Sequence, residues 1–218
     1  CKSGAKFLRK AVLWQCYLSG AGGVEWILSD LLNSHDFRRY EALWGYTRHA
    51  RSFMEQLPLG DMVPSHQLLT GESPYTVPYY DIAGVVLAKP GEVYAVQLPN
   101  ATQTATLDLS GASGSFIKRW YNPRSGMFEG TSAPVTAGGS VSLGAPPSSV
   151  GDDWVVLIQK SGSSGNQAPT ANAGADRTAA LGQAGPPAGW HYAPWTGDTN
   201  SGVSASSIYT ATHCFGDN

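Results

Sequence analysis

The sequence predicts an α+β chain: helical segments come first, a small antiparallel β-sandwich follows, and an irregular tail ends the chain. Apolar residues recur at helical spacing over residues 4–19 and 36–57. Between residues 81 and 160, short apolar runs alternate with turn residues at intervals of roughly eight to twelve positions, which is typical of a sandwich. From residue 161 the chain is rich in alanine, glycine, serine and proline, which indicates a linker.

Composition limits the possible functions. The 218 residues allow one large domain or two small ones, and a 42% hydrophobic content allows a packed core. Charged residues make up only 14%, and the net charge of −2 gives no electrostatic reason to expect nucleic acid or an anionic membrane as a partner. No apolar run approaches the roughly 20 residues that span a bilayer, so no membrane segment is predicted.

The first helix is expected over residues 4–19, with apolar side chains on most of its sides, as in a buried helix. Glycines within residues 20–23 end it. Residues 24–28 are expected to form a short apolar strand that carries one acid, Glu25. Helix, glycine loop and strand make one step of an α/β unit, so the partner strands would lie upstream of residue 1.

The second helix is expected over residues 36–57, where a wide apolar stripe suits packing on a larger body. Residues 58–80 are expected to form a turn-rich, extended loop. Residues 154–158 are apolar throughout, which predicts a central strand buried on both faces. In all, we expect six strands in the sandwich, at residues 82–88, 92–98, 105–110, 115–121, 139–143 and 153–159.

Turn residues and charges add detail to the sandwich. Tight turns are expected at residues 89–92 and 122–126, where proline and glycine are close together. Nearby charges of opposite sign could form cross-strand pairs, with Arg119 and Arg124 as the cations and Asp108 and Asp152 as the anions.

Cysteine and histidine spacing indicates neither a metal nor a cofactor. Cys1, Cys16 and Cys214 are too few and too widely spaced for a disulfide framework or a zinc site. Cys16 lies among apolar residues and is expected to be a buried free thiol. The histidines have no second ligand at metal spacing, so no metal and no cofactor are predicted.

Residues 90–160 carry the segments GEVYAVQLPN, TLDLSG, RWYNPRSG and DDWVVLIQK. With these segments they resemble the C-terminal β-sandwich of many secreted bacterial glycoside-hydrolase-like proteins, a family named as a "putative collagen-binding" domain. The resemblance implies an extracellular, multidomain bacterial protein in which the sandwich is an accessory domain.

Two further resemblances suggest the domain organisation. Residues 6–69 include FLRKAVLWQCYLSGAGGVEW and DFRRYEALWGYTRHARSFMEQLPLGDMVPSHQLL, which are similar to the last helix, last strand and exit helix of the (β/α)₈ catalytic barrel that precedes such a sandwich. Residues 166–178, NQAPTANAGADRT, look like the first strand of a polycystic-kidney-disease-type module. These resemblances imply a barrel end at 1–80, the accessory sandwich at 81–160, and a linker with the truncated start of further modules at 161–218.

Glu25 is the strongest candidate for a cleft acid, because barrel enzymes place their sites at the C-terminal ends of the strands. Glycoside hydrolysis needs two carboxyl groups, and the resemblance implies that both lie upstream of residue 1. The catalytic residues are therefore unknown, and Glu25 is expected to bind sugar or tune a pKa. Alternatively, Glu25 pairs with Arg38 or Arg39 at the barrel rim.

The other candidate substrate-binding residues also have structural alternatives. Trp26 could stack on a sugar ring or belong to the core. Asp30 and His35 follow on the next loop and could line the same cleft or lie in solvent. In the sandwich, an aromatic set could form a glycan platform or simply pack in the core; it comprises Trp120, Tyr121, Phe128 and Trp154.

Two functions follow from the sequence. In the first, the chain is a fragment of a secreted polysaccharide-degrading glycoside hydrolase, inactive alone because it lacks the main catalytic carboxylates. In the second, it is a non-catalytic module that binds glycan or matrix, or only braces the barrel. The expected partner is a polysaccharide or oligosaccharide. A glycan-binding sandwich should expose Trp120 or Trp154 in a row, whereas a bracing one should bury both against residues 36–57.

Overall fold

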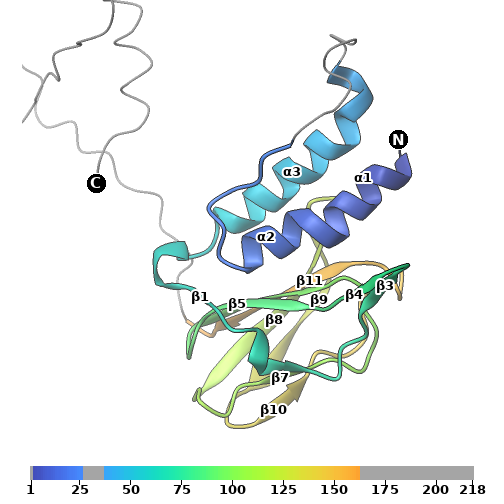
Figure 1. Cartoon of the computed structure of the whole chain (residues 1–218). Coiled ribbons are helices and arrows are strands. Elements are labelled where there is room, and N and C mark those ends of the chain that lie inside the picture. Colours follow the sequence, from blue (N-terminus) through green and yellow to red (C-terminus); the bar gives the residue numbers. More distant parts are fainter. Residues whose placement is uncertain (1, 27–36, 163–218) are drawn as a thin grey trace, which may run out of the picture. The chain divides into compact units, whose positions relative to one another are not determined.

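The computed structural model describes residues 2–26 and 37–162 (Figure 1). Asp30 and His35 lie outside the described residues, and so does everything from residue 163 onward, including the 166–178 segment. Among the helices of the described part, none is long and apolar enough to cross a membrane.

Two helical stretches precede the strands, as predicted. The first consists of α1 (Lys2–Leu8), a π-helical turn η1 (Arg9–Leu13) and α2 (Trp14–Leu18). The second consists of the 3-10 helix η2 (Phe37–Tyr40) and α3 (Glu41–Met54). The first stretch ends at Gly20, whose φ of +89° suits glycine at a helix C-terminus.

The first helical stretch is less buried than expected. Full burial is confined to one side, which carries Leu13, Trp14 and Leu18 but also the charged Arg9 and Lys10. The predicted strand at residues 24–28 is wrong for its described part, because residues 24–26 are irregular. Val24 and Trp26 are half-buried instead, and the indole Nε1 of Trp26 donates to Thr47 Oγ1 in α3 at 3.0 Å.

A six-stranded antiparallel sheet forms the centre of the fold, in the order β1-β5-β6-β11-β8-β9. Its strands are β1 (Val63–Pro64), β5 (Val85–Lys89), β6 (Val93–Leu98), β11 (Trp154–Lys160), β8 (Ser115–Asn122) and β9 (Met127–Thr136). A three-stranded sheet contains β10 (Ser140–Ser142), β7 (Thr106–Asp108) and β2 (Leu69–Thr70), and a hairpin joins β3 (Tyr75–Val77) to β4 (Tyr80–Ile82). Two 3-10 turns are η3 (Leu59–Asp61) and η4 (His66–Leu68).

The large sheet is covered on both faces. Figure 1 shows α1, α2 and α3 on one face and the strands β7 and β10 on the other. We call the apolar cluster between the two sheets the inner core; it includes Val86, Val96, Leu107, Phe116, Trp120, Leu143, Trp154, Val156 and Ile158. We call the cluster beneath the helices the outer core; it includes Leu13, Trp14, Leu18, Ala50, Phe53, Leu57, Val85, Leu87, Tyr121, Val155 and Leu157.

Strand β11 contributes to both cores and confirms the predicted central strand. It pairs with β6 on one side and β8 on the other. Successive side chains of a strand point to opposite faces, so Trp154, Val156 and Ile158 enter the inner core while Val155 and Leu157 enter the outer core.

All six predicted strands are present, but the sheets contain more. Strand β9 was not predicted, because a mostly exposed edge strand lacks an apolar alternation. Strand β1 pairs with β5, and strand β2 pairs with β7. The sandwich therefore includes residues from 63 onward, and a boundary at residue 81 would separate β1 and β2 from the strands with which they pair.

Leu57→Ala is expected to lower the free energy of unfolding by about 2–5 kcal/mol, because this outer-core side chain is 2% exposed. Leu59→Ala is the matched control: its side chain is 45% exposed, and the loss should stay within about 0.5 kcal/mol. Denaturant unfolding of both variants measures the difference. Equal losses would contradict the packing of the helices on the sheet.

Candidate functional site

The RWYNPRSG segment, residues 119–126, builds the turn between β8 and β9. The Asn122 side-chain Oδ1 accepts a hydrogen bond from the Arg124 backbone N–H at 2.9 Å, and the Asn122 carbonyl accepts one from the Gly126 N–H, also at 2.9 Å. Gly126 has a φ of +73°, a conformation that favours glycine. The predicted turn at 122–126 is therefore confirmed as a turn stabilised by its own asparagine side chain.

Helix α3 packs on this turn through His49. The Nδ1 of His49 lies 3.3 Å from the Pro123 carbonyl, and Tyr121 donates its hydroxyl to the His49 carbonyl at 2.7 Å. Burial raises the pKa of Tyr121 to about 12. A Cβ atom on Gly126 would lie 2.5 Å from His49 Cδ2, so only glycine leaves room for the ring.

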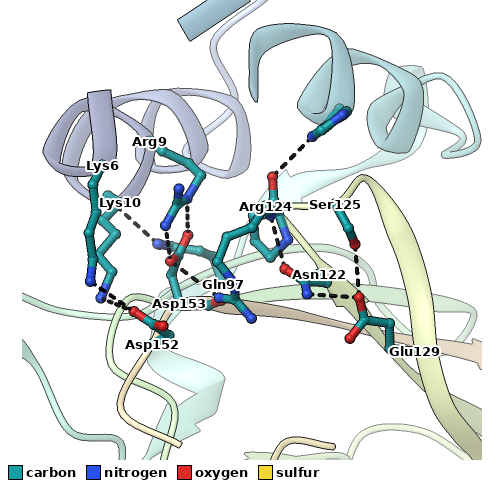
Figure 2. A network of polar contacts seen from close by, with 12 residues as sticks. Lys6, Arg9, Lys10, Gln97, Asn122, Arg124, Ser125, Glu129, Asp152 and Asp153 are labelled. Atoms are coloured by element: carbon teal, nitrogen blue, oxygen red, sulfur yellow. Dashed lines mark hydrogen bonds and ion pairs between the residues drawn. The ribbon is translucent and has the colours of Figure 1, made fainter. Parts of the chain in front are cut away.

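A carboxylate behind the turn holds its side chains in place (Figure 2). Glu129 Oε1 accepts hydrogen bonds from Asn122 Nδ2 and Ser125 Oγ, both at 2.8 Å. The turn is thus fixed by β9 on one side and by α3 on the other.

The strongest polar contact between the helices and the sandwich is the ion pair of Arg9 and Asp153. Arg9 donates from Nε and Nη2 to the two carboxylate oxygens at 2.8 and 2.7 Å, and the side chains are 2% and 0% exposed. Burial lowers the pKa of Arg9, but the hydrogen bonds and charge of Asp153 outweigh it and leave the pKa raised. The guanidinium also lies 4.4 Å from the centre of the Tyr46 ring.

Arg124 connects this ion pair to the turn. Its Nη1 donates to the Asp153 carbonyl at 2.5 Å and lies 3.5 Å from Oδ1 of the same residue. Its guanidinium also stacks over Trp154, 4.8 Å from the ring centre. One aspartate therefore binds two arginines, one from the first helical stretch and one from the turn, as Figure 2 shows.

A second acid, Asp152, holds two lysines of the same helical stretch. Its Oδ1 lies 3.1 Å from Lys6 Nζ and 3.4 Å from Lys10 Nζ. Burial raises the pKa of Asp152, but the lysines outweigh this effect and leave it lowered. Burial lowers the pKa of Lys10, whose ammonium also lies 4.7 Å from the centre of the Tyr75 ring.

Gln97 completes the contact at the π-helical turn. This side chain is fully buried in β6, donates to the Lys10 carbonyl at 3.0 Å, and accepts from Gln15 Nε2 at 2.7 Å. A π-helix has a wider hydrogen-bond spacing than an α-helix. Gln97 therefore binds the backbone of the first helical stretch at η1, where the hydrogen-bond spacing of the helix changes.

The structure separates the residues predicted to bind substrate. Glu25 is exposed, whereas Trp26 is half-buried and bonded to Thr47. Trp120 and Trp154 are 5% and 0% exposed and meet edge to face in the inner core, so neither presents a ring to solvent. Neither packs on residues 36–57 as the bracing alternative expected.

Tyr121, rather than Trp120 or Trp154, packs against residues 36–57. It lies in the outer core with its ring 4.8 Å from that of Phe53 in α3. Arg119 makes a cross-strand contact, but with Gln159 rather than with an acid, and its guanidinium stacks over Phe128. Arg124 contacts Asp153, the neighbour of the predicted Asp152.

Sequence reasoning missed the main polar contacts of this site. Arg9 and Lys10 are two adjacent cations inside the apolar run of residues 7–14, and Asp152 and Asp153 directly precede the most apolar strand. Paired charges next to apolar runs in both segments were the sequence feature that could have indicated a buried ion pair. Within residues 2–26 and 37–162, no group of three or more histidines, cysteines or acids is placed to hold a metal, and Cys16 is a half-buried free thiol.

Asp153→Asn is expected to lower the free energy of unfolding by about 3–5 kcal/mol, because it leaves Arg9 buried without its counter-charge. Asp61→Asn is the control: this aspartate pairs with Lys89 at 3.0 Å but is 63% exposed, so the loss should be below about 1 kcal/mol. Chemical denaturation measures both, and a negligible effect of Asp153→Asn would rule out a structural role for the ion pair.

Gly126→Ala should destabilise the chain more than Gly91→Ala. Both glycines have positive φ, +73° and +83°, so each variant bears a strain of about 1–2 kcal/mol. Only at Gly126 would the new methyl group collide with His49, since nothing lies within 4 Å at Gly91. In a His49→Ala background, the cost of Gly126→Ala should fall toward that of Gly91→Ala. Thermal unfolding of the double-mutant cycle tests this, and an unchanged cost would disprove the contact.

Comparison with known proteins agrees with the position of the sandwich. Residues 63–159 match a family model described as "Putative collagen-binding domain of a collagenase". A solved structure titled "Glycoside hydrolase" shares 18% identity at a TM-score of 0.45; the match covers 66% of this chain and 30% of that one. A glycoside hydrolase family 5 structure from Bacteroides vulgatus ATCC 8482 shares 16% sequence identity at a TM-score of 0.42. That match covers 56% of this chain and 25% of the other. The chain thus spans less than a third of either structure. No curated protein matches.

Proposed function

We propose that this chain is the accessory C-terminal part of a secreted bacterial glycoside hydrolase that degrades polysaccharide. In this proposal, the sandwich braces the helical end of the catalytic barrel. The observation that carries the proposal is the buried ion pair of Arg9 and Asp153, which joins the helices to the sandwich across 144 positions of sequence.

The burial of both faces of the large sheet supports the proposal that the sandwich braces the helices. An antiparallel sheet commonly leaves one face in water. Here one face packs on the small sheet and the other on α2, η1 and α3. The family match begins at residue 63, so the helices belong to sequence outside it. This arrangement suits a sandwich whose partner is a helical body.

The buried aspartate has a structural rather than a catalytic role in this proposal. Asp153 is fully buried and bound by two arginines, so it is not free to protonate a leaving group. In this proposal the catalytic carboxylates lie in another part of the protein, and the chain is expected to be inactive alone. Glu25, Trp26, Asp30 and His35 remain the proposed substrate-cleft residues of the barrel end.

The decisive experiment uses the complete gene product that contains this chain. Asp153→Asn should lower the temperature at which its glycosidase activity is lost by several degrees, with kcat and KM unchanged at low temperature. Asp61→Asn serves as the surface control. The chain by itself should not cleave aryl glycosides.

Two outcomes would contradict the proposal. Aryl-glycoside turnover by the isolated chain would show that the catalytic pair is present in it. Retention of the chain on insoluble polysaccharide or on collagen would favour the alternative, a non-catalytic glycan- or matrix-binding module. We expect no retention, because the sandwich aromatics Trp120, Tyr121 and Trp154 are buried.

A further inference from the structure

A histidine completes the edge of the large sheet. The short strand β1 pairs with β5 through Val63 and Pro64, and the next residue, Ser65, donates its N–H to the Val86 carbonyl at 2.8 Å. The Val86 N–H has no backbone acceptor in this ladder. It donates instead to Nδ1 of the His66 side chain at 3.0 Å.

This hydrogen bond fixes the protonation of the ring. An imidazole nitrogen accepts a hydrogen bond only when it carries no proton, so Nδ1 is bare and the single proton lies on Nε2. Nε2 lies 3.5 Å from the hydroxyl of Ser19, the C-terminal cap residue of α2. The neutral ring therefore connects the sheet edge to the end of the first helical stretch.

We propose that His66 is an acid-sensitive latch between the first helical stretch and the edge of the large sheet. A proton on Nδ1 competes directly with the Val86 N–H, so acid breaks the contact. The ring is exposed, which gives solvent protons access to it. This inference does not depend on the proposed function.

Both contacts of the ring described above are to uncharged groups, Ser19 and Val86. The titratable groups on the neighbouring elements are Cys16 and Tyr17 in α2, Lys89 at the end of β5 and Asp61 in η3. Lys89 and Asp61 form an ion pair with each other at 3.0 Å.

The opening should be local. The two contacts of the ring lie at the sheet edge, at Val86 and Ser19, whereas β11 at the sheet centre is paired on both sides. Acid should therefore open the contact at Val86 without unfolding the sandwich.

The test is NMR on the ¹⁵N-labelled chain. At pH 7.5, long-range ¹H–¹⁵N spectra should show His66 protonated on Nε2 only. Between pH 7.5 and 5, protection of the Val86 amide, corrected for intrinsic exchange, should fall about fivefold, as expected for the loss of one ordinary hydrogen bond. The amide of Val156 in β11 should keep its protection.

Two variants control the experiment. His66→Asn places an amide oxygen near the position of Nδ1 but does not titrate, so Val86 protection should no longer depend on pH. His66→Leu removes the acceptor and should give the low protection already at pH 7.5. A proton on Nδ1 at neutral pH would overturn the proposal, and so would the same pH response in wild type and His66→Asn.

Discussion

The buried contact of Arg9 with Asp153 sets the orientation on which the rest of this structure depends. Taking two charges out of water costs several kcal/mol per ion, and only good geometry with further hydrogen bonds offsets that cost. Here the bond is bidentate, and Arg124 adds a second cation to the same aspartate. The outer core supplies the apolar burial, while the ion pair permits only one placement of the helices on the sheet.

The two recognisable segments of the sandwich therefore share one physical task. The RWYNPRSG turn holds α3 through His49, and the aspartates before β11 hold the first helical stretch. Arg124 and Asp153 join the two segments directly. Both segments thus contact the helices, and their aromatic residues Trp120, Tyr121 and Trp154 lie in the two cores.

Local patterns made much of the fold predictable, and long-range pairing explains the rest. The unbroken apolar run at residues 154–158 was enough to identify β11 as a central strand, because burial on both faces leaves no polar position. Strand β9 has no such pattern, since solvent reaches most of its residues. Arg9 and Asp153 are 144 positions apart, and the sequence around either residue does not indicate that the two form an ion pair. Trp120 and Trp154 looked equally suited to a glycan or a core, and only the completed sheet decides between them.

Strand β9 has a further consequence for how this protein behaves in solution. A ten-residue strand at the edge of a sheet offers unpaired backbone groups to any other chain with a free edge. Pro134 removes one donor from that edge, the register breaks between Lys118 and Trp120, and Pro147 packs against Gly130. These irregularities interrupt the regular row of backbone groups that a second chain would need in order to pair along this edge.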